Sequence, residues 1–287
     1  MREANRHLLT LAEQLTASYK SIPSLRALLL TGSVAEGEAD FYSDIDLILY
    51  YEALPTEEAL ERLRVQNGGS ARLWMLGERA EGSVMESYQV RGVECQLTHS
   101  TVARWEENMA SILEQFTVDT PLHKALAGLL AGRALYGDDL IHRWQAQVKN
   151  YPPALAQAMV RHYLNFVPLW ALTGRLGPRD SELLQRQMVV ENVQHLLGVL
   201  AGLNHLYYST FQFKRMHRFI AQMHLTPRNL AARLDDVLGS EPLHAAPVLK
   251  SLIQDTVALM EQQIPEIDTS QVRAQLEREA APWGPRR

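Results

Sequence analysis

Two aspartates separated by one residue, Asp44 and Asp46, stand at the start of an apolar run that predicts a β-strand over residues 45–51. Side chains two positions apart on a strand point to the same face, roughly 6.5–7 Å from one another. Carboxylates placed in this way can bind one or two hard divalent cations, and Mg²⁺ is usually held by carboxylates together with substrate phosphates. A carboxylate inside an apolar strand is costly without a partner, so we interpret the pair as metal ligands rather than as a turn and a surface residue.

Gly32 and Ser33 follow directly after a second buried strand, predicted over residues 25–31. Glycine allows the backbone to approach a phosphate closely. The serine hydroxyl and backbone N–H groups at the start of a following helix can donate hydrogen bonds to phosphate oxygens. The two motifs together predict a site for a metal-bound, phosphate-bearing substrate.

The elements that must position these residues change in character near residue 100. Before it we predict helices over 3–20 and 56–65, strands over 25–31, 45–51 and 71–76, and a hairpin of strands 85–90 and 93–97 joined by Arg91-Gly92. After it we predict helices over 101–116, 121–134, 138–150, 153–173 with a kink at Pro168, 181–203, 227–238 and 246–264, and a frayed tail over 280–287.

This pattern predicts an α+β protein of two domains. The N-terminal catalytic domain, residues 1–117, has a mixed β-sheet flanked by helices. An all-helical C-terminal domain, residues 118–287, follows and is expected to bind the substrate.

Gly-Ser followed ten residues later by Asp-x-Asp, between two strands, resembles the nucleotidyltransferase superfamily that includes DNA polymerase β. The finer pattern GSxAxGxxxxxSDxDL resembles the minimal and the aminoglycoside and lincosamide nucleotidyltransferases. The resemblance implies that Gly32 and Ser33 contact the phosphates of a nucleotide. It also implies that Asp44 and Asp46 bind Mg²⁺ and take part in catalysis.

A third carboxylate on a later strand completes the metal site in the superfamily. Glu94 lies inside the predicted strand 93–97 and is our candidate for this catalytic metal ligand, with Glu86 as the runner-up. The alternative for Glu94 is an outward-facing strand residue.

Two further residues in the helical half have predicted roles. Glu191, in an apolar helical run, is the candidate general base toward the acceptor; a glutamate paired with an arginine between helices is the alternative. Lys214, or its neighbour Arg215, would contact the triphosphate; a solvated helix-face charge is the alternative. Residues 203–214 resemble the LN-x-x-Y…K stretch of helical domains in several bacterial family members, and residues 135–138 resemble a segment after their first long helices.

The resemblance implies an enzyme that transfers a nucleoside monophosphate from a nucleoside triphosphate, with ATP favoured, to a hydroxyl group and releases pyrophosphate. Two Mg²⁺ ions would assist. A small molecule of the aminoglycoside or lincosamide type is the first choice of acceptor, which would make the protein an antibiotic-resistance enzyme. The alternatives are a tRNA or protein acceptor, as in toxin-type relatives, and an inactive nucleotide-binding module.

Net charge, cysteine content and the absence of other motifs exclude several further classes of protein. The net charge of −5 disfavours sequence-independent binding to long nucleic acid, and a single cysteine excludes a disulfide framework. We expect a cytoplasmic protein, because neither a secretory signal nor an apolar run long enough to span a membrane is visible. It would be a monomer or a homodimer, since some members of the resembling superfamily share active sites between two subunits. No P-loop, dinucleotide-binding or HExxH motif is present. Cys95 is expected to be a packed core thiol, and His99 is an outside candidate for the cleft.

Overall fold

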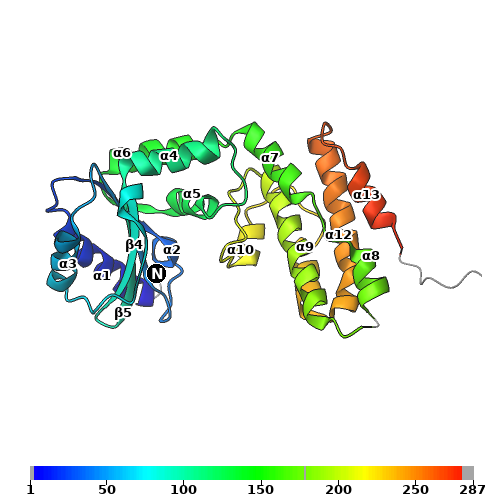
Figure 1. Cartoon of the computed structure of the whole chain (residues 1–287), viewed down its shortest axis with the longest axis horizontal. Helices are drawn as coiled ribbons and strands as arrows, with labels where there is room; N and C mark the ends of the chain where they lie inside the picture. Colours follow the sequence, from blue (N-terminus) through cyan, green and yellow to red (C-terminus); the bar gives the residue numbers. More distant parts are fainter. Residues whose placement is uncertain (1–2, 178, 280–287) are drawn as a thin grey trace, which may run out of the picture. The chain divides into compact units, whose positions relative to one another are not determined.

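The computed structural model describes residues 3–177 and 179–279, so the tail expected over 280–287 lies outside the described residues. Chain contacts divide the protein into two compact units, residues 1–115 with 124–150, and residues 116–123 with 151–287. The segment 124–150 therefore packs with the N-terminal residues, although it follows the boundary expected after residue 117. Figure 1 shows the elements of each unit.

The N-terminal part of the chain combines a sheet with helices on both of its faces. Its elements are α1 (Glu3–Tyr19), β1 (Leu25–Thr31), α2 (Gly32–Ala35), β2 (Ile45–Tyr51), α3 (Glu57–Gln66), β3 (Trp74–Glu78), η1 (Arg79–Glu81), β4 (Ser83–Val90), β5 (Val93–Thr101), α4 (Val102–Leu113), α5 (Leu122–Ala131), β6 (Arg133–Tyr136) and α6 (Asp138–Lys149).

The six strands form one mixed sheet in the order β3-β4-β5-β2-β1-β6. Strands β2 and β5 are parallel, and every other neighbouring pair is antiparallel. The β4–β5 hairpin turns at Arg91 and Gly92, both with positive φ, as a two-residue connection of this kind requires.

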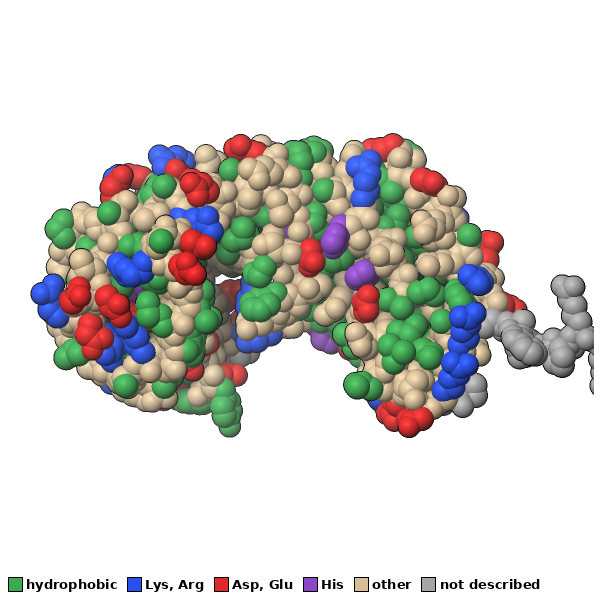
Figure 2. All heavy atoms as spheres, in the orientation of Figure 1, with side chains coloured by type: hydrophobic (Ala, Val, Ile, Leu, Met, Phe, Trp, Pro, Cys, Tyr) green, Lys and Arg blue, Asp and Glu red, His purple; other side chains and the backbone are tan. Residues whose placement is uncertain are grey.

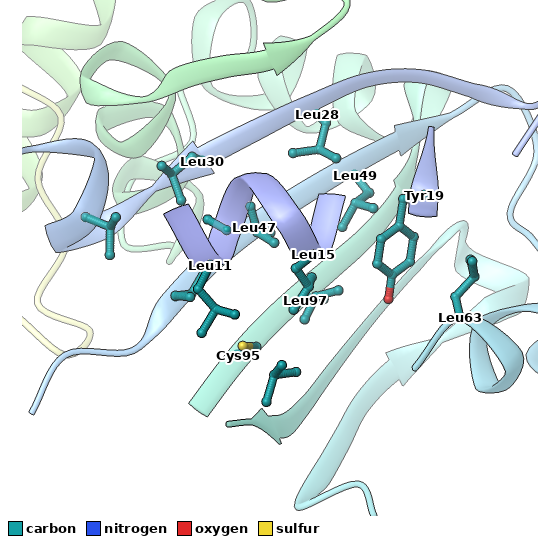
Figure 3. Packing of buried hydrophobic residues seen from close by; sticks show 14 of the residues in the cluster. Leu11, Leu15, Tyr19, Leu28, Leu30, Leu47, Leu49, Leu63, Cys95 and Leu97 are labelled. Carbon is teal, nitrogen blue, oxygen red and sulfur yellow. The ribbon is translucent and has the colours of Figure 1, made fainter. Parts of the chain in front are cut away.

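One face of the sheet carries the main hydrophobic core. Alternate residues of β1, β2 and β5 point toward α1, which presents an apolar stripe at three- and four-residue spacing. Figure 3 shows this packing, with labelled residues Leu11, Leu15 and Tyr19 of α1 over Leu28, Leu30, Leu47, Leu49, Cys95 and Leu97. Cys95 is a fully buried free thiol, which confirms its predicted place in the core.

The opposite face is covered by helices at one end. Tyr50 of β2 packs against Trp105 of α4 and Trp144 of α6, with ring centroids 5.5 and 4.8 Å away. On α5, a Cβ added at Gly128 would lie 3.9 Å from Thr31.

The C-terminal unit is a helical bundle. Helix α9 packs against both α7 and α12, and α11 packs against α12. Its elements are α7 (Pro153–Tyr163), α8 (Leu169–Ala171), the π-helical turn η2 (Leu172–Leu176), α9 (Glu182–Leu203), α10 (Met216–Ile220), α11 (Leu230–Gly239), α12 (Pro242–Gln263) and α13 (Ser270–Glu277). No helix of the described chain is long and apolar enough to cross a membrane.

The α+β architecture with a mixed sheet and a helical C-terminal region is as expected from the sequence, but several local predictions are wrong. The strand expected over 71–76 begins only at Trp74 and runs to Glu78. The helix expected over 121–134 ends at Ala131, and residues 133–136 form β6 at the sheet edge because their backbone pairs with β1. The helix expected over 153–173 stops at Tyr163 and helical structure resumes after Pro168, since proline cannot donate its backbone hydrogen bond. The helix expected over 246–264 is α12, which begins earlier, at Pro242, and contains Pro247 in its second turn.

Candidate active site

Gly32 occupies a position that other residues would disturb. It begins α2 with φ +65°, a left-handed conformation that glycine adopts without steric cost. A Cβ placed there would lie 2.1 Å from Oδ2 of Asp46. The backbone at the end of β1 therefore lies close to the carboxylate of Asp46, a predicted metal ligand, and leaves no room for a side chain at residue 32. Ser33, the next residue, is half-buried in the first turn of α2.

Asp44 and Asp46 lie at the start of β2, on the face opposite the core. Ile45 and Leu47, which alternate with them, are almost fully buried, whereas both aspartates are partly exposed. Asp46 is paired in register with Thr31 of β1 on one side and with Gln96 of β5 on the other.

Glu94 lies beside Asp44 because β2 and β5 run parallel with Ile45 opposite Cys95. The amide of Gln96 joins the two acids: its Nε2 donates to Asp44 Oδ2 at 2.9 Å and to Glu94 Oε1 at 3.3 Å. The hydroxyl of buried Ser87 on β4 also donates to Glu94 Oε1, at 2.7 Å. The fold therefore brings Glu94 and Asp44 together through a shared hydrogen-bond donor.

Gln96 and Ser87 were not singled out in the sequence. Gln96 could have been, because it is two residues from Glu94 on one strand and must share its face. Ser87 could not, since its approach to Glu94 depends on the pairing of β4 with β5.

The donor chemistry of this site fits Mg²⁺. Asp44, Asp46 and Glu94 supply carboxylate oxygens, which are the ligands that hard divalent cations prefer. No group of three or more His, Cys, Asp or Glu side chains within residues 3–177 and 179–279 is already gathered as a metal site. In this arrangement the Gln96 amide takes up one oxygen each of Asp44 and Glu94.

Glu86 and His99 lie on the other face of the sheet. Both are buried: His99 Nε2 is 3.3 Å from one oxygen of Glu86, Arg72 Nε donates to the other at 2.6 Å, and His99 Nδ1 lies 3.0 Å from the Tyr51 hydroxyl. Burial raises the pKa of the Glu86 carboxyl, but the hydrogen bonds and charges of His99 and Arg72 outweigh it and hold the pKa below its usual value. Neither residue shares the face of Asp44, so the structure removes both His99, the outside candidate for the cleft, and Glu86, the runner-up for the third carboxylate.

Glu191 and Lys214 belong to the C-terminal unit. Glu191 is half-buried on α9, and Lys214 is exposed in the segment between α9 and α10. Arg215, the alternative to Lys214, caps α10 with φ +61°. The roles of these residues toward a nucleotide remain predictions.

No model of a known protein family matches the chain, and no curated protein matches its sequence. Among solved structures it is similar to a nucleotidyltransferase-like protein from Exiguobacterium sibiricum, with 14% identity over 88% of this chain and 78% of that one and a TM-score of 0.34. Similarity at this level carries no weight for function, which must come from the residues of the site.

Proposed function

We propose that the protein is a Mg²⁺-dependent nucleotidyltransferase that moves a nucleoside monophosphate from a nucleoside triphosphate to a hydroxyl group. The observation that supports this most is that Asp46 occupies the space a side chain at Gly32 would need, on the sheet face where the Gln96 amide bonds both Asp44 and Glu94. A phosphate-binding motif and three oxygen donors thereby come from neighbouring strands.

In this proposal each residue has a separate task. Gly32 and Ser33 bind the phosphates through the backbone and the serine hydroxyl. Asp44, Asp46 and Glu94 would hold Mg²⁺, which when bound neutralises phosphate charge and lowers the pKa of a coordinated hydroxyl. The acceptor oxygen forms a bond to the α-phosphorus while the bond from that phosphorus to the bridging oxygen breaks. Pyrophosphate leaves with the bond electrons, and a base takes the hydroxyl proton.

We propose a small molecule as the acceptor, of the aminoglycoside or lincosamide type, with ATP as the donor. A tRNA or protein acceptor is the second possibility. The face of the N-terminal unit drawn in Figure 2 shows basic and acidic side chains interleaved. The formal net charge of the whole chain is −5, whereas nucleic-acid-binding domains are usually basic, and this charge favours the small molecule.

The test uses purified protein, Mg²⁺ and each of four α-³²P-labelled nucleoside triphosphates, offered with aminoglycosides, lincosamides, total tRNA or a cell lysate. The double variant Asp44→Asn/Asp46→Asn is the blank, and Glu38→Gln, an exposed acid of the same loop, is the matched control. Label on a small molecule with wild type and Glu38→Gln, absent from the blank, supports the proposal.

Label on tRNA or protein would move the acceptor to the macromolecular class. Nucleotide binding without any transfer would favour a binding module. If wild type bound no nucleoside triphosphate, the site assignment itself would be wrong.

A further inference from the structure

The carboxylate face of the sheet continues into an apolar area on β3 and β4. Register pairs Trp74 of β3 with Ser87 of β4, Ser87 with Gln96 of β5, and Gln96 with Asp46 of β2. Side chains of paired residues share a face, so these residues form one row across the sheet. With about 4.8 Å between strands, Trp74 lies roughly 14 Å from Asp46 along this row.

Two more apolar side chains lie on the same face, in the neighbouring row of paired residues. Leu76 is paired with Met85, and their side chains lie on the same face as Trp74. Leu76 is 60% exposed and Met85 is 37% exposed, although both are large apolar residues. We call Trp74, Leu76 and Met85 the apolar shelf.

The order of the strands places the shelf on the side of the carboxylates that is away from Gly32. Gly32 follows β1, the aspartates begin β2, Glu94 lies on β5, and the shelf lies beyond it on β4 and β3. In phosphoryl transfer the attacking and leaving oxygens are roughly in line through phosphorus. If pyrophosphate leaves over Gly32, the acceptor hydroxyl must approach from the side of Glu94, and the body of the acceptor then extends over β4 and β3.

We propose, resting on the nucleotidyltransferase function proposed above, that the shelf binds the body of the acceptor and that the acceptor is a hydroxylated small molecule of low charge with an apolar face. The side chains that border the shelf on β4 and β5 are neutral: Ser87, Gln96 and Thr98. One carboxylate lies on the same face nearby, the exposed Glu78 at the end of β3. An aminoglycoside carries several ammonium groups, and binding on this surface would remove their hydration without offering a carboxylate partner to each of them. Between the two antibiotic classes, a lincosamide therefore fits better than a polycationic aminoglycoside.

The chain offers a matched control for this surface. Met75 is also 37% exposed, but it is paired with Glu86 and lies on the opposite face of the same two strands. A methyl-¹³C-methionine spectrum therefore contains a reporter on the shelf, Met85, and a reporter of equal exposure away from it. Met85→Ser and Met75→Ser assign the two signals.

The experiment titrates protein bound to Mg²⁺ and the non-hydrolysable α,β-methylene ATP with lincomycin or kanamycin. We expect lincomycin to shift the Met85 signal and leave Met75 unmoved, and kanamycin to shift neither. Leu76→Ser, which keeps the Met85 reporter, should raise the dissociation constant for lincomycin about tenfold, because a lost apolar contact is worth about that much. Its affinity for the nucleotide should stay as in wild type.

Three results would overturn the inference: no shift of Met85 with lincomycin, an equal or larger shift with kanamycin, or unchanged lincomycin affinity in Leu76→Ser. Each leaves the nucleotidyltransferase proposal in place as long as the nucleotide's ³¹P signals respond to the protein. Failure of those ³¹P signals to respond would instead count against the proposed function.

Discussion

Replacement of Gly32 by alanine tests the site most sharply, because the structure separates its two effects. The first effect is on the backbone: φ +65° costs an L-residue roughly 1–2 kcal/mol. The second is a collision, since the new Cβ would stand 2.1 Å from Asp46 Oδ2, whereas ordinary contact begins at 3.4 Å. The carboxylate of Asp46 must then move by roughly 1.3 Å, and a misplacement of about 1 Å in a catalytic site can lower the rate about 100-fold.

Gly37 provides the control for the first effect alone. It has φ +76°, and a Cβ there would meet no atom within 4 Å. We expect Gly37→Ala to lose about 1–2 kcal/mol of the free energy of unfolding in urea titrations, and Gly32→Ala to lose at least as much because Asp46 must also move. Nucleotidyl transfer should fall about 100-fold in Gly32→Ala and stay within about threefold of wild type in Gly37→Ala. Equal transfer rates in the two variants would refute the placement of Asp46 in the reaction.

Three further outcomes are expected. Gln96→Glu should lower transfer more than about tenfold and change the Mg²⁺ concentration for half-maximal rate, because a third like charge replaces the donor shared by two carboxylates; an unchanged Mg²⁺ titration would contradict this. The folded-state pKa of Glu86 lies below its usual value of 4.5, so its pairing with Arg72 and His99 stabilises the fold above that pH and is lost as pH falls through the folded pKa. Urea titrations should therefore show Glu86→Gln destabilised by roughly 1–3 kcal/mol at pH 7, with the difference from wild type shrinking as the pH falls through the folded-state pKa; a difference that stays constant down to acid pH would contradict the coupling. Burial raises the pKa of the Cys95 thiol to about 12, so a disulfide reagent should react only at the rate of unfolding, and rapid labelling of the native protein would show the core to be open.

The local sequence pattern was enough to predict much of the N-terminal unit. Alternation over 45–51 placed Asp44 and Asp46 on one face, because successive strand residues point to opposite sides whatever the rest of the fold does. The apolar stripe of α1 and the glycine turn at Arg91-Gly92 are equally local, and both were predicted with nearly correct bounds.

The choice between Glu94 and Glu86 needed tertiary structure. The hairpin alone places them on opposite faces, since Glu94 is paired with Gln89 and Glu86 with Leu97. Which face carries the site is decided only by the parallel pairing of β5 with β2, two strands more than forty residues apart in the chain. That register puts Glu94 beside Asp44 and buries Glu86.

Two other features of the fold also depend on contacts between residues that are far apart in the sequence. Residues 133–136 become a strand because the edge of β1 supplies their hydrogen-bond partners, whereas the local pattern predicts a helix that runs to residue 134. The apolar shelf exists because two antiparallel pairings bring Trp74, Leu76 and Met85 to the face of the carboxylates. The sequence by itself determined which residues are candidates for binding a metal ion and phosphates, because residue type and spacing along one strand are local. Only the tertiary structure decided which of them meet and what surface lies beside them, because strand register is a long-range property.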